Sequence, residues 1–178
     1  MRHILILGLV CFISACGFRP LYIQRSETDF YSGKDQSSSI INELAQIKIP
    51  PISDRFGQQI RNKLLDLLTP KGIPAKAKYR LDVVLANKVV SQQAMRNDVT
   101  ATSERVDYTV KYTLYEGSEK LVSGDSYAFV SYNILNNPYS TTMAQKKSEE
   151  NAANIIANDI ALRLGAFFHF DKTKQDDI

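Results

Sequence analysis

The sequence predicts an α+β fold, a two-layer sandwich in which a four-stranded mixed sheet carries two helices on one face. Three stretches between residues 78 and 134 alternate apolar and polar residues, as half-buried strands do. Two further stretches carry apolar residues at the three- to four-residue spacing of amphipathic helices. The expected order of elements is β-α-β-β-β-α.

The first strand is predicted in Ile40–Ile49, where Ala45, Ile47 and Ile49 alternate with polar residues. Pro50-Pro51 ends it, because proline lacks the N–H that a strand needs.

The first helix is predicted over Asp54–Leu68, with Ser53 as its N-cap and Asp54 in its first turn. The segment Thr69–Gly72 contains proline and glycine and should end it. Helical spacing relates its apolar residues, which are Phe56, Ile60, Leu64, Leu67 and Leu68.

Three strands follow. Lys78–Val90 alternates, and Gln92–Asp98 is predicted to be a polar connection. Thr100–Tyr115 has the clearest alternation in the chain, and Leu121–Ile134 is its expected partner across a hairpin turn at Glu116–Glu119. Within each strand the apolar residues should share one face, namely Tyr79, Leu81, Val83 and Leu85 in the first, Val106, Tyr108, Val110, Tyr112 and Leu114 in the second, and Ala128, Val130, Tyr132 and Ile134 in the third.

The second helix is predicted over Ser140–Phe168, and residues 171–178 are expected to form a flexible tail. One stripe of this helix should face the sheet, namely Ala152, Ile156, Ile160, Leu164 and Phe167.

Residues 1–15 have the layout of a bacterial lipoprotein signal peptide. Arg2 supplies a positive charge, Ile4–Ile13 is apolar, and Ser14-Ala15 is small. The apolar run is shorter than the ~20 residues that span a bilayer. The junction Ile13–Cys16 resembles a lipobox, so we expect Cys16 to be acylated and to become the first mature residue.

We expect residues 16–39 to form the lipid anchor and tether, and residues 40–170 to form the domain. Because Cys11 lies in the leader, the mature domain would hold no disulfide. Gly17 follows the lipidated residue, which is typical of export to the periplasmic face of the outer membrane.

The sequence contains no set of residues that would predict an enzyme. The mature chain has one histidine, His169, and no free thiol once Cys16 is acylated. Glu104 and Asp107 should face opposite sides of a strand, and Glu149 and Glu150 should diverge on a helix. We therefore expect no catalytic residue, cofactor or metal. The formal net charge of +3, without an arginine-rich run, does not favour nucleic-acid binding.

Basic residues are the better functional candidates, because lysine and arginine can pair with phosphate. They lie after the first helix and along the predicted hairpin, at Lys71, Lys76, Lys78, Arg80, Arg96, Arg105, Lys111 and Lys120. Solubilising surface charges remain the alternative for each of them.

The run Cys16-Gly17-Phe18-Arg19-Pro20-Leu21-Tyr22 resembles the mature start of lipopolysaccharide-assembly lipoproteins of the LptE family, in their alphaproteobacterial form. The expected order of elements is also similar to that family's fold. The resemblance implies a non-catalytic protein that plugs and helps assemble an LptD-type outer-membrane β-barrel. It also implies participation in lipopolysaccharide transport to the outer leaflet, with Arg96 and Lys120 as candidate contacts to lipopolysaccharide. The alternative is an auxiliary lipoprotein of an ABC-type lipid transporter.

Overall fold

The computed structural model describes the backbone of residues 40–95 and 101–176, and the side chains of residues 40–93 and 102–170. The chain divides into two units, Met1–Lys34 and Asp35–Ile178, and all described residues belong to the second. The predictions for the signal peptide, the tether, Cys16 and Arg96 therefore lie outside the described residues.

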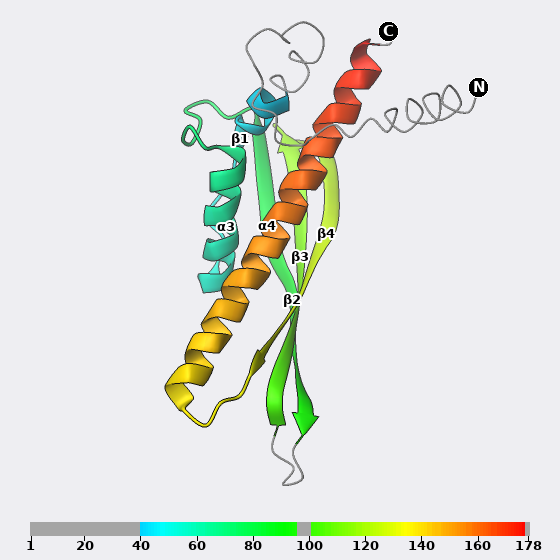
Figure 1. Ribbon diagram of the computed structural model, residues 1–178. Coiled ribbons are helices and arrows are strands. Elements are labelled where there is room, and N and C mark those ends of the chain that lie inside the picture. The colour runs from blue at the N-terminus through cyan, green and yellow to red at the C-terminus, as the bar shows by residue number, and fades with distance from the viewer. Residues whose placement is uncertain (1–39, 96–100, 177–178) are drawn as a thin grey trace, which may run out of the picture. The chain divides into compact units, whose positions relative to one another are not determined.

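A single four-stranded sheet forms one layer of the described unit (Figure 1). Its strand order is β1-β2-β3-β4, and the sheet is mixed because β1 runs parallel to β2 while the other pairs are antiparallel. The bounds are Ile47–Lys48 for β1, Tyr79–Met95 for β2, Ala101–Glu116 for β3 and Glu119–Asn133 for β4.

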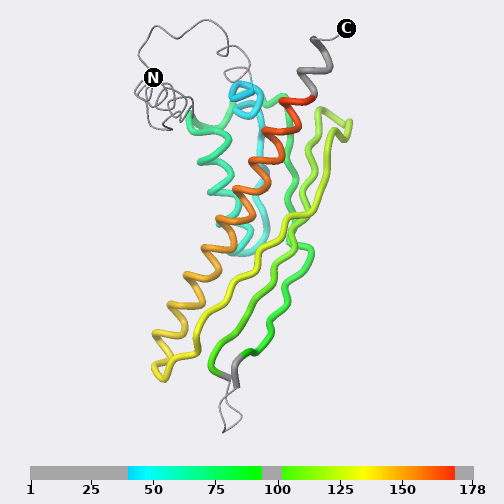
Figure 2. The backbone as a smooth tube through the Cα atoms, turned by 45° about the vertical axis from the view of Figure 1, so that its right-hand side comes forward, coloured from blue at the N-terminus to red at the C-terminus, as the bar shows by residue number. Residues whose placement is uncertain are grey.

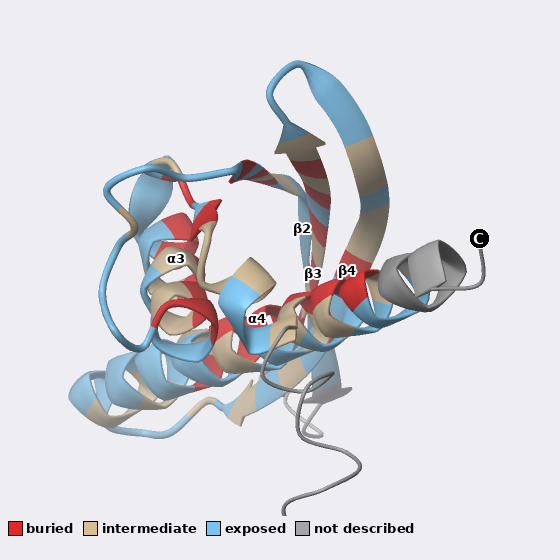
Figure 3. Cartoon of the chain, turned by 90° about the horizontal axis from the view of Figure 1, so that it is seen from above, coloured by how far each residue is buried: buried red, intermediate tan, exposed pale blue. Residues whose placement is uncertain are grey.

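Two helices, α3 (Asp54–Leu68) and α4 (Pro138–Asp176), form the other layer. Figures 1 and 2 show α4 running along the sheet beside α3. Seen from above, the buried residues lie where the helices and the strands face one another, and the outer side of α4 is exposed (Figure 3). The α+β two-layer prediction, with both helices on one face of a mixed sheet, is confirmed.

Burial of apolar side chains between the two layers holds them together. The alternation predicted for β2 and β3 puts Leu81, Val110 and Leu114 fully inside, and α3 and α4 contribute Leu64 and Ile160 from the other side. Phe56 of α3 also stacks on Tyr108 of β3, with 4.2 Å between the ring centroids. These contacts fix α3 and α4 on one face of the sheet, and neither helix covers the opposite face.

The first strand is much shorter than predicted. Residues 40–44 are helical, and only Ile47–Lys48 pairs with β2. The amide of Ala45 donates to the carbonyl of Ile41, which is a helical hydrogen bond. The prediction of a strand from Ile40 was therefore wrong for these residues, because the alternation of apolar residues begins only at Ala45. Pro50 and Pro51 then prevent further pairing, because neither has an N–H to donate.

The second strand is longer than predicted, because Gln92 and Gln93 pair with Glu104 and Ser103 of β3 and do not form a connection. A register shift between Leu85 and Asn87 marks a bulge.

The helix ends also differ in detail. Ser53 is the N-cap of α3 but makes no side-chain cap bond, and the amide of Gly57 donates to Asp54 Oδ1 at 2.7 Å instead. Asp54 has a positive φ of 65°, a conformation that aspartate tolerates better than most residues. In α4, Phe168 and not Phe167 is the buried end of the stripe, and it packs on Tyr79. The backbone of α4 continues to Asp176, into the predicted tail.

Candidate functional site

The two faces of the sheet differ in how far helices cover them. The inner face packs against α3 and α4, and the outer face carries the alternate residues of every strand. We define the outer face by its exposed or half-buried side chains: Lys48 on β1; Arg80, Asp82, Val84, Asn87 and Val89 on β2; Arg105, Asp107, Thr109, Lys111, Thr113 and Tyr115 on β3; and Lys120, Asp125, Tyr127 and Phe129 on β4.

Most charges of the outer face are already paired within it. Arg105 Nε lies 2.7 Å from Asp107 Oδ1, and Lys111 Nζ lies 3.1 Å from Asp125 Oδ1. These exposed pairs contribute little to stability, but they reduce the number of cations available to a ligand. Of the basic residues that the sequence singled out, Arg105 and Lys111 are therefore neutralised by neighbours.

Large apolar side chains are exposed between these ion pairs. Val84 is 61% exposed, Tyr127 50% and Phe129 60%. The guanidinium of Arg105 lies 5.0 Å from the centroid of the Phe129 ring. Tyr127 and Phe129 lie on the side of β4 opposite to the buried Ala128, so both face away from the helices. A surface that combines exposed aromatic rings with ordered charges has the composition of a protein interface.

Of the two predicted contacts to lipopolysaccharide, Lys120 lies among the described residues. Lys120 pairs in register with Tyr115, which pairs with Arg80 near the start of β2. Arg96 lies outside the described residues. Lys120 shares its end of the sheet with a basic residue that the sequence reasoning missed, Lys48, which only the strand pairing reveals.

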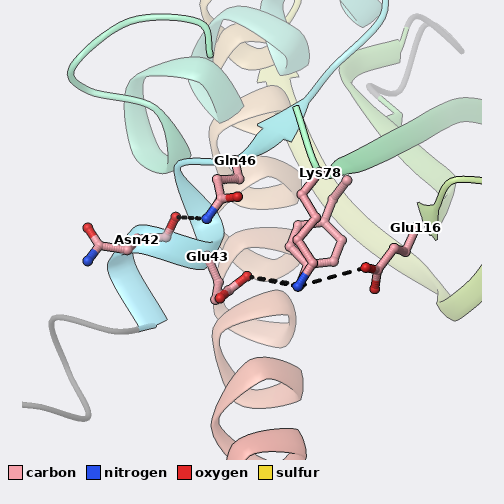
Figure 4. A network of polar contacts seen from close by, with 6 residues as sticks. Asn42, Glu43, Gln46, Lys78 and Glu116 are labelled. Atoms are coloured by element: carbon pink, nitrogen blue, oxygen red, sulfur yellow. Dashed lines mark hydrogen bonds and ion pairs between the residues drawn. The ribbon is translucent and has the colours of Figure 1, made fainter. Parts of the chain in front are cut away.

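Lys78 is held in a polar network at the end of the sheet where β2 begins (Figure 4). Its Nζ lies 3.7 Å from Glu43 Oε2 and 3.8 Å from Glu116 Oε1. The Tyr79 hydroxyl also donates to Glu43, at 2.9 Å. Hydrogen bonding with Tyr79 and the two carboxylates raise the pKa of the Lys78 ammonium. The network ties residues 40–44 to the sheet. The ammonium group of Lys78 therefore has a structural role, in which it pairs with two carboxylates.

A small cavity of about 70 Å³ lies between α4 and the inner face. The Tyr132 hydroxyl donates to Glu104 there, and the buried Ser148 Oγ has no protein partner among the described residues. A polar cavity of this size suits ordered water. Its lining residues are Lys88, Val90, Glu104, Val106, Tyr108, Tyr132, Gln145, Ser148 and Glu149.

Tyr108 makes stability sensitive to alkaline pH. Burial, and then the charge of Glu149, raises the pKa of Tyr108 to about 12. The same tyrosine ionises near pH 10 in the unfolded chain. Between these values the unfolded state releases its proton first, so stability is present below about pH 10 and falls as the pH rises to 12.

We expect Tyr108→Phe to abolish about 2 kcal/mol of this alkaline loss, because phenylalanine keeps the ring and has no proton to release. Urea unfolding at pH 9 and pH 11.5 measures the loss in wild type and variant. Tyr127→Phe, at an exposed position, is the control and should keep the wild-type loss. An undiminished loss in the Tyr108 variant would contradict the assignment.

The acidic pairs considered as catalytic candidates do not converge. Asp107 pairs with Arg105 on the outer face, whereas Glu104 accepts from Tyr132 on the inner face. Glu149 and Glu150 pair with Arg55 and Lys147, respectively. Among the side chains of residues 40–93 and 102–170, no three His, Cys, Asp or Glu residues are grouped as metal ligands would be. Within the described ranges, no helix has the length and apolarity needed to cross a membrane.

The fold is similar to those of three solved bacterial lipoproteins. The chain is similar to a lipoprotein from Caulobacter crescentus CB15, at 22% identity and a TM-score of 0.61, over 74% of this chain and 96% of that one. Rare lipoprotein B from Shewanella oneidensis is similar at 8% identity and a TM-score of 0.50, over 73% of this chain and 96% of that one. At these identities, the similarity shows the fold alone.

Lipoprotein B from Nitrosomonas europaea is also similar, at 13% identity and a TM-score of 0.51, over 68% of this chain and 81% of that one. No curated protein matches the sequence. The family model described as LptE, lipopolysaccharide-assembly, matches residues 44–164, which is more than half of the chain and covers β1 through most of α4. This chain therefore belongs to the LptE family of lipopolysaccharide-assembly proteins.

Proposed function

We propose that this protein is an outer-membrane lipoprotein, held on the periplasmic face by an acylated Cys16, that plugs an LptD-type β-barrel. In this role it helps the barrel to assemble and takes part in lipopolysaccharide transport to the outer leaflet. Family membership supports a role in lipopolysaccharide assembly. The lipobox-like junction before Cys16 supports the anchor.

The composition of the outer face is the observation that best supports a contact with the barrel. It exposes Tyr127, Phe129 and Val84 on a sheet whose other face is covered by helices. The inside of a large β-barrel is polar. Paired charges such as Lys111 and Asp125, placed among aromatic rings, can meet such a wall through hydrogen bonds as well as apolar contact.

The mechanism would be positional. The packed core behind the outer face keeps β2, β3 and β4 in fixed register, so the exposed side chains are presented without a loss of backbone freedom on binding. The protein would brace the barrel wall. This role does not require a covalent bond to form or break.

Photo-cross-linking from the outer face tests the proposal. We expect a photoreactive amino acid at Tyr127 or Phe129, in the full-length protein in cells, to capture a large outer-membrane β-barrel protein. The reason is that both side chains are at least half exposed on the face proposed to contact the wall. Mass spectrometry identifies the adduct.

The same photoreactive group at Asn151 and Asn158, which are exposed on α4, is the matched control. We expect clearly lower yields from these positions. Capture of an inner-membrane transporter instead of a barrel would favour the ABC-transporter alternative, and equal yields from sheet and helix would sink the assignment of the outer face.

A further inference from the structure

The edge of β2 that faces β1 lacks a strand partner for most of its length. β1 pairs with β2 only at Tyr79 and Arg80, whereas β2 continues to Met95. Among the described residues, no other strand lies on that side of β2. An edge of this kind presents backbone N–H and C=O groups with which another extended chain can pair.

The amide of Tyr79 shows which residues face this edge. It donates to the carbonyl of Gln46 at 3.2 Å, on the β1 side. Because alternate residues of a strand direct their backbone groups to the same neighbour, Val83 and Leu85 direct theirs to the unpaired side. Val84 lies between them and directs its own to β3. The register shift after Leu85 ends the series, and we call Val83 and Leu85 the open edge.

A groove of about 370 Å³ lies along the open edge. One wall is Asp82–Leu85 of β2, and the other is Pro50–Asp54. A strand rises ~3.3 Å per residue, so the β2 wall spans roughly 10 Å and a segment of about three to five residues would fill it. The groove therefore has the length of a short strand.

Hydrogen bonds hold the wall opposite β2 away from the open edge. The carbonyl of Ile49 accepts from Arg61 Nε at 3.1 Å, and the carbonyl of Ile52 accepts from Gln58 Nε2 at 2.7 Å. Both donors belong to α3. Pro50-Pro51, between these carbonyls, has no N–H to donate. This segment therefore cannot extend β1 along the open edge, which leaves the groove available to another chain.

The lining of the groove is both apolar and acidic. Pro51 is exposed and Val84 is 61% exposed, and Asp54 and Asp82 add carboxylates. Asp82 pairs with Arg80, but Asp54 has no basic partner within 4.0 Å among the described residues. An extended chain sends successive side chains to opposite sides, so one set can contact the apolar lining while the other meets the carboxylates.

We propose that this groove binds an extended segment of a partner protein, in which apolar and basic residues alternate, and that the segment adds to β2 as a further strand. The N–H and C=O groups of the open edge pair with the backbone of the segment. Asp54 and Asp82 select its basic side chains. The site goes beyond the proposed function, because it recognises a partner through backbone pairing and not through the aromatic residues of the outer face.

Hydrogen exchange of single amides, measured by NMR on the isotope-labelled mature protein, tests the pairing. The probe is an acetylated and amidated peptide of five residues in which valine alternates with lysine. We expect exchange at Val83 and Leu85 to slow roughly tenfold near saturation, because their N–H groups become hydrogen-bonded. The amide of Val84 should keep its rate, since it already faces β3. Slowing at all three amides, or at none, would overturn strand addition.

Two N-methylated forms of the peptide test the backbone contact from the other side. Methyl groups on alternate amides remove the donors from one edge of the extended peptide and leave those of the other edge. We expect one form to bind far more weakly than the unmodified peptide, and the other to bind nearly as well. Equal binding by the two forms would overturn backbone pairing.

The double variant Asp54→Asn/Asp82→Asn tests the selection of basic residues. Asparagine can still accept from the amide of Gly57 and tolerates the positive φ at residue 54. We expect it to bind the lysine peptide roughly threefold to tenfold more weakly, as for two exposed ion pairs. Asp125→Asn/Asp159→Asn removes the same charge elsewhere and should bind like the wild type. An equally weakened control, or a glutamate peptide that binds as well as the lysine peptide, would overturn the selection.

Two other occupants of the groove are outcomes of the exchange measurement. Slow exchange at Val83 and Leu85 before any peptide is added would show that the groove is already filled. The occupant would be a second copy if the slowing depends on protein concentration, and the same chain if it does not. Either result would overturn the partner segment. The proposed function is judged separately, by cross-linking from Tyr127 and Phe129 on β4.

Discussion

Leu164→Ala should lower the free energy of unfolding by about 2–5 kcal/mol. Leu164 lies on the inner side of α4 and is fully buried, at 0% exposure. Its side chain belongs to the core that joins α4 to α3 and the sheet. Truncation removes apolar contacts and leaves a cavity that the packed helices and strands can fill only in part. Urea unfolding of the mature chain measures the change.

Leu162→Ala supplies a control with the same chemical change on the same helix. Leu162 is 74% exposed, so its truncation should alter the free energy of unfolding by less than ~0.5 kcal/mol. A similar small effect at both positions would mean that α4 does not pack on the sheet as described. The proposed role depends on this packing, because the helices hold the outer face in register.

Cys16→Ser should abolish lipid attachment and release the protein from the membrane fraction. The thioether to diacylglycerol forms on sulfur, which serine lacks. Several acyl chains on one residue anchor a protein stably, so their loss should remove this attachment. Metabolic labelling with a fatty acid, followed by fractionation of the envelope, measures both effects.

Cys11→Ser is the matched control, because Cys11 is the other of the two cysteines in the sequence and lies within the predicted leader. We expect it to retain label and membrane association at the wild-type level. Labelled Cys16→Ser protein would place the acyl group elsewhere. Loss of label from the Cys11 variant would show that residues 1–15 do not act as the predicted leader.

Elements with long local periodicity could be predicted closely from the sequence. The bounds of α3, Asp54–Leu68, are those that the apolar spacing and the proline after it indicate. The hairpin between β3 and β4 was also predicted, because Glu116–Glu119 separates two alternating segments. In these cases the information lies within one turn or one strand pair, where local backbone preference and the hydrophobic pattern agree.

Elements that depend on distant partners could not be predicted from the sequence. The helical turn at residues 40–44 is tied to the sheet by contacts of Glu43 with Tyr79 and Lys78, which lie far along the chain. The extension of β2 through Gln92 and Gln93 arises from backbone pairing with β3, which side-chain polarity does not report. Phe168 replaces Phe167 in the core because Tyr79 offers it a ring to pack on.

The candidate site shows the same division. The class of fold, the covered and open faces of the long strands, and the resemblance that led to the LptE family could all be inferred from the sequence, because alternation and motif are local properties. Which charges are free depends instead on the pairing of distant segments. Lys48, Arg80 and Lys120 come from three strands, and strand pairing places them at the same end of the sheet. Ion pairs neutralise Lys78, Arg80, Arg105 and Lys111, whereas Lys48 and Lys120 have no acidic partner among the described residues.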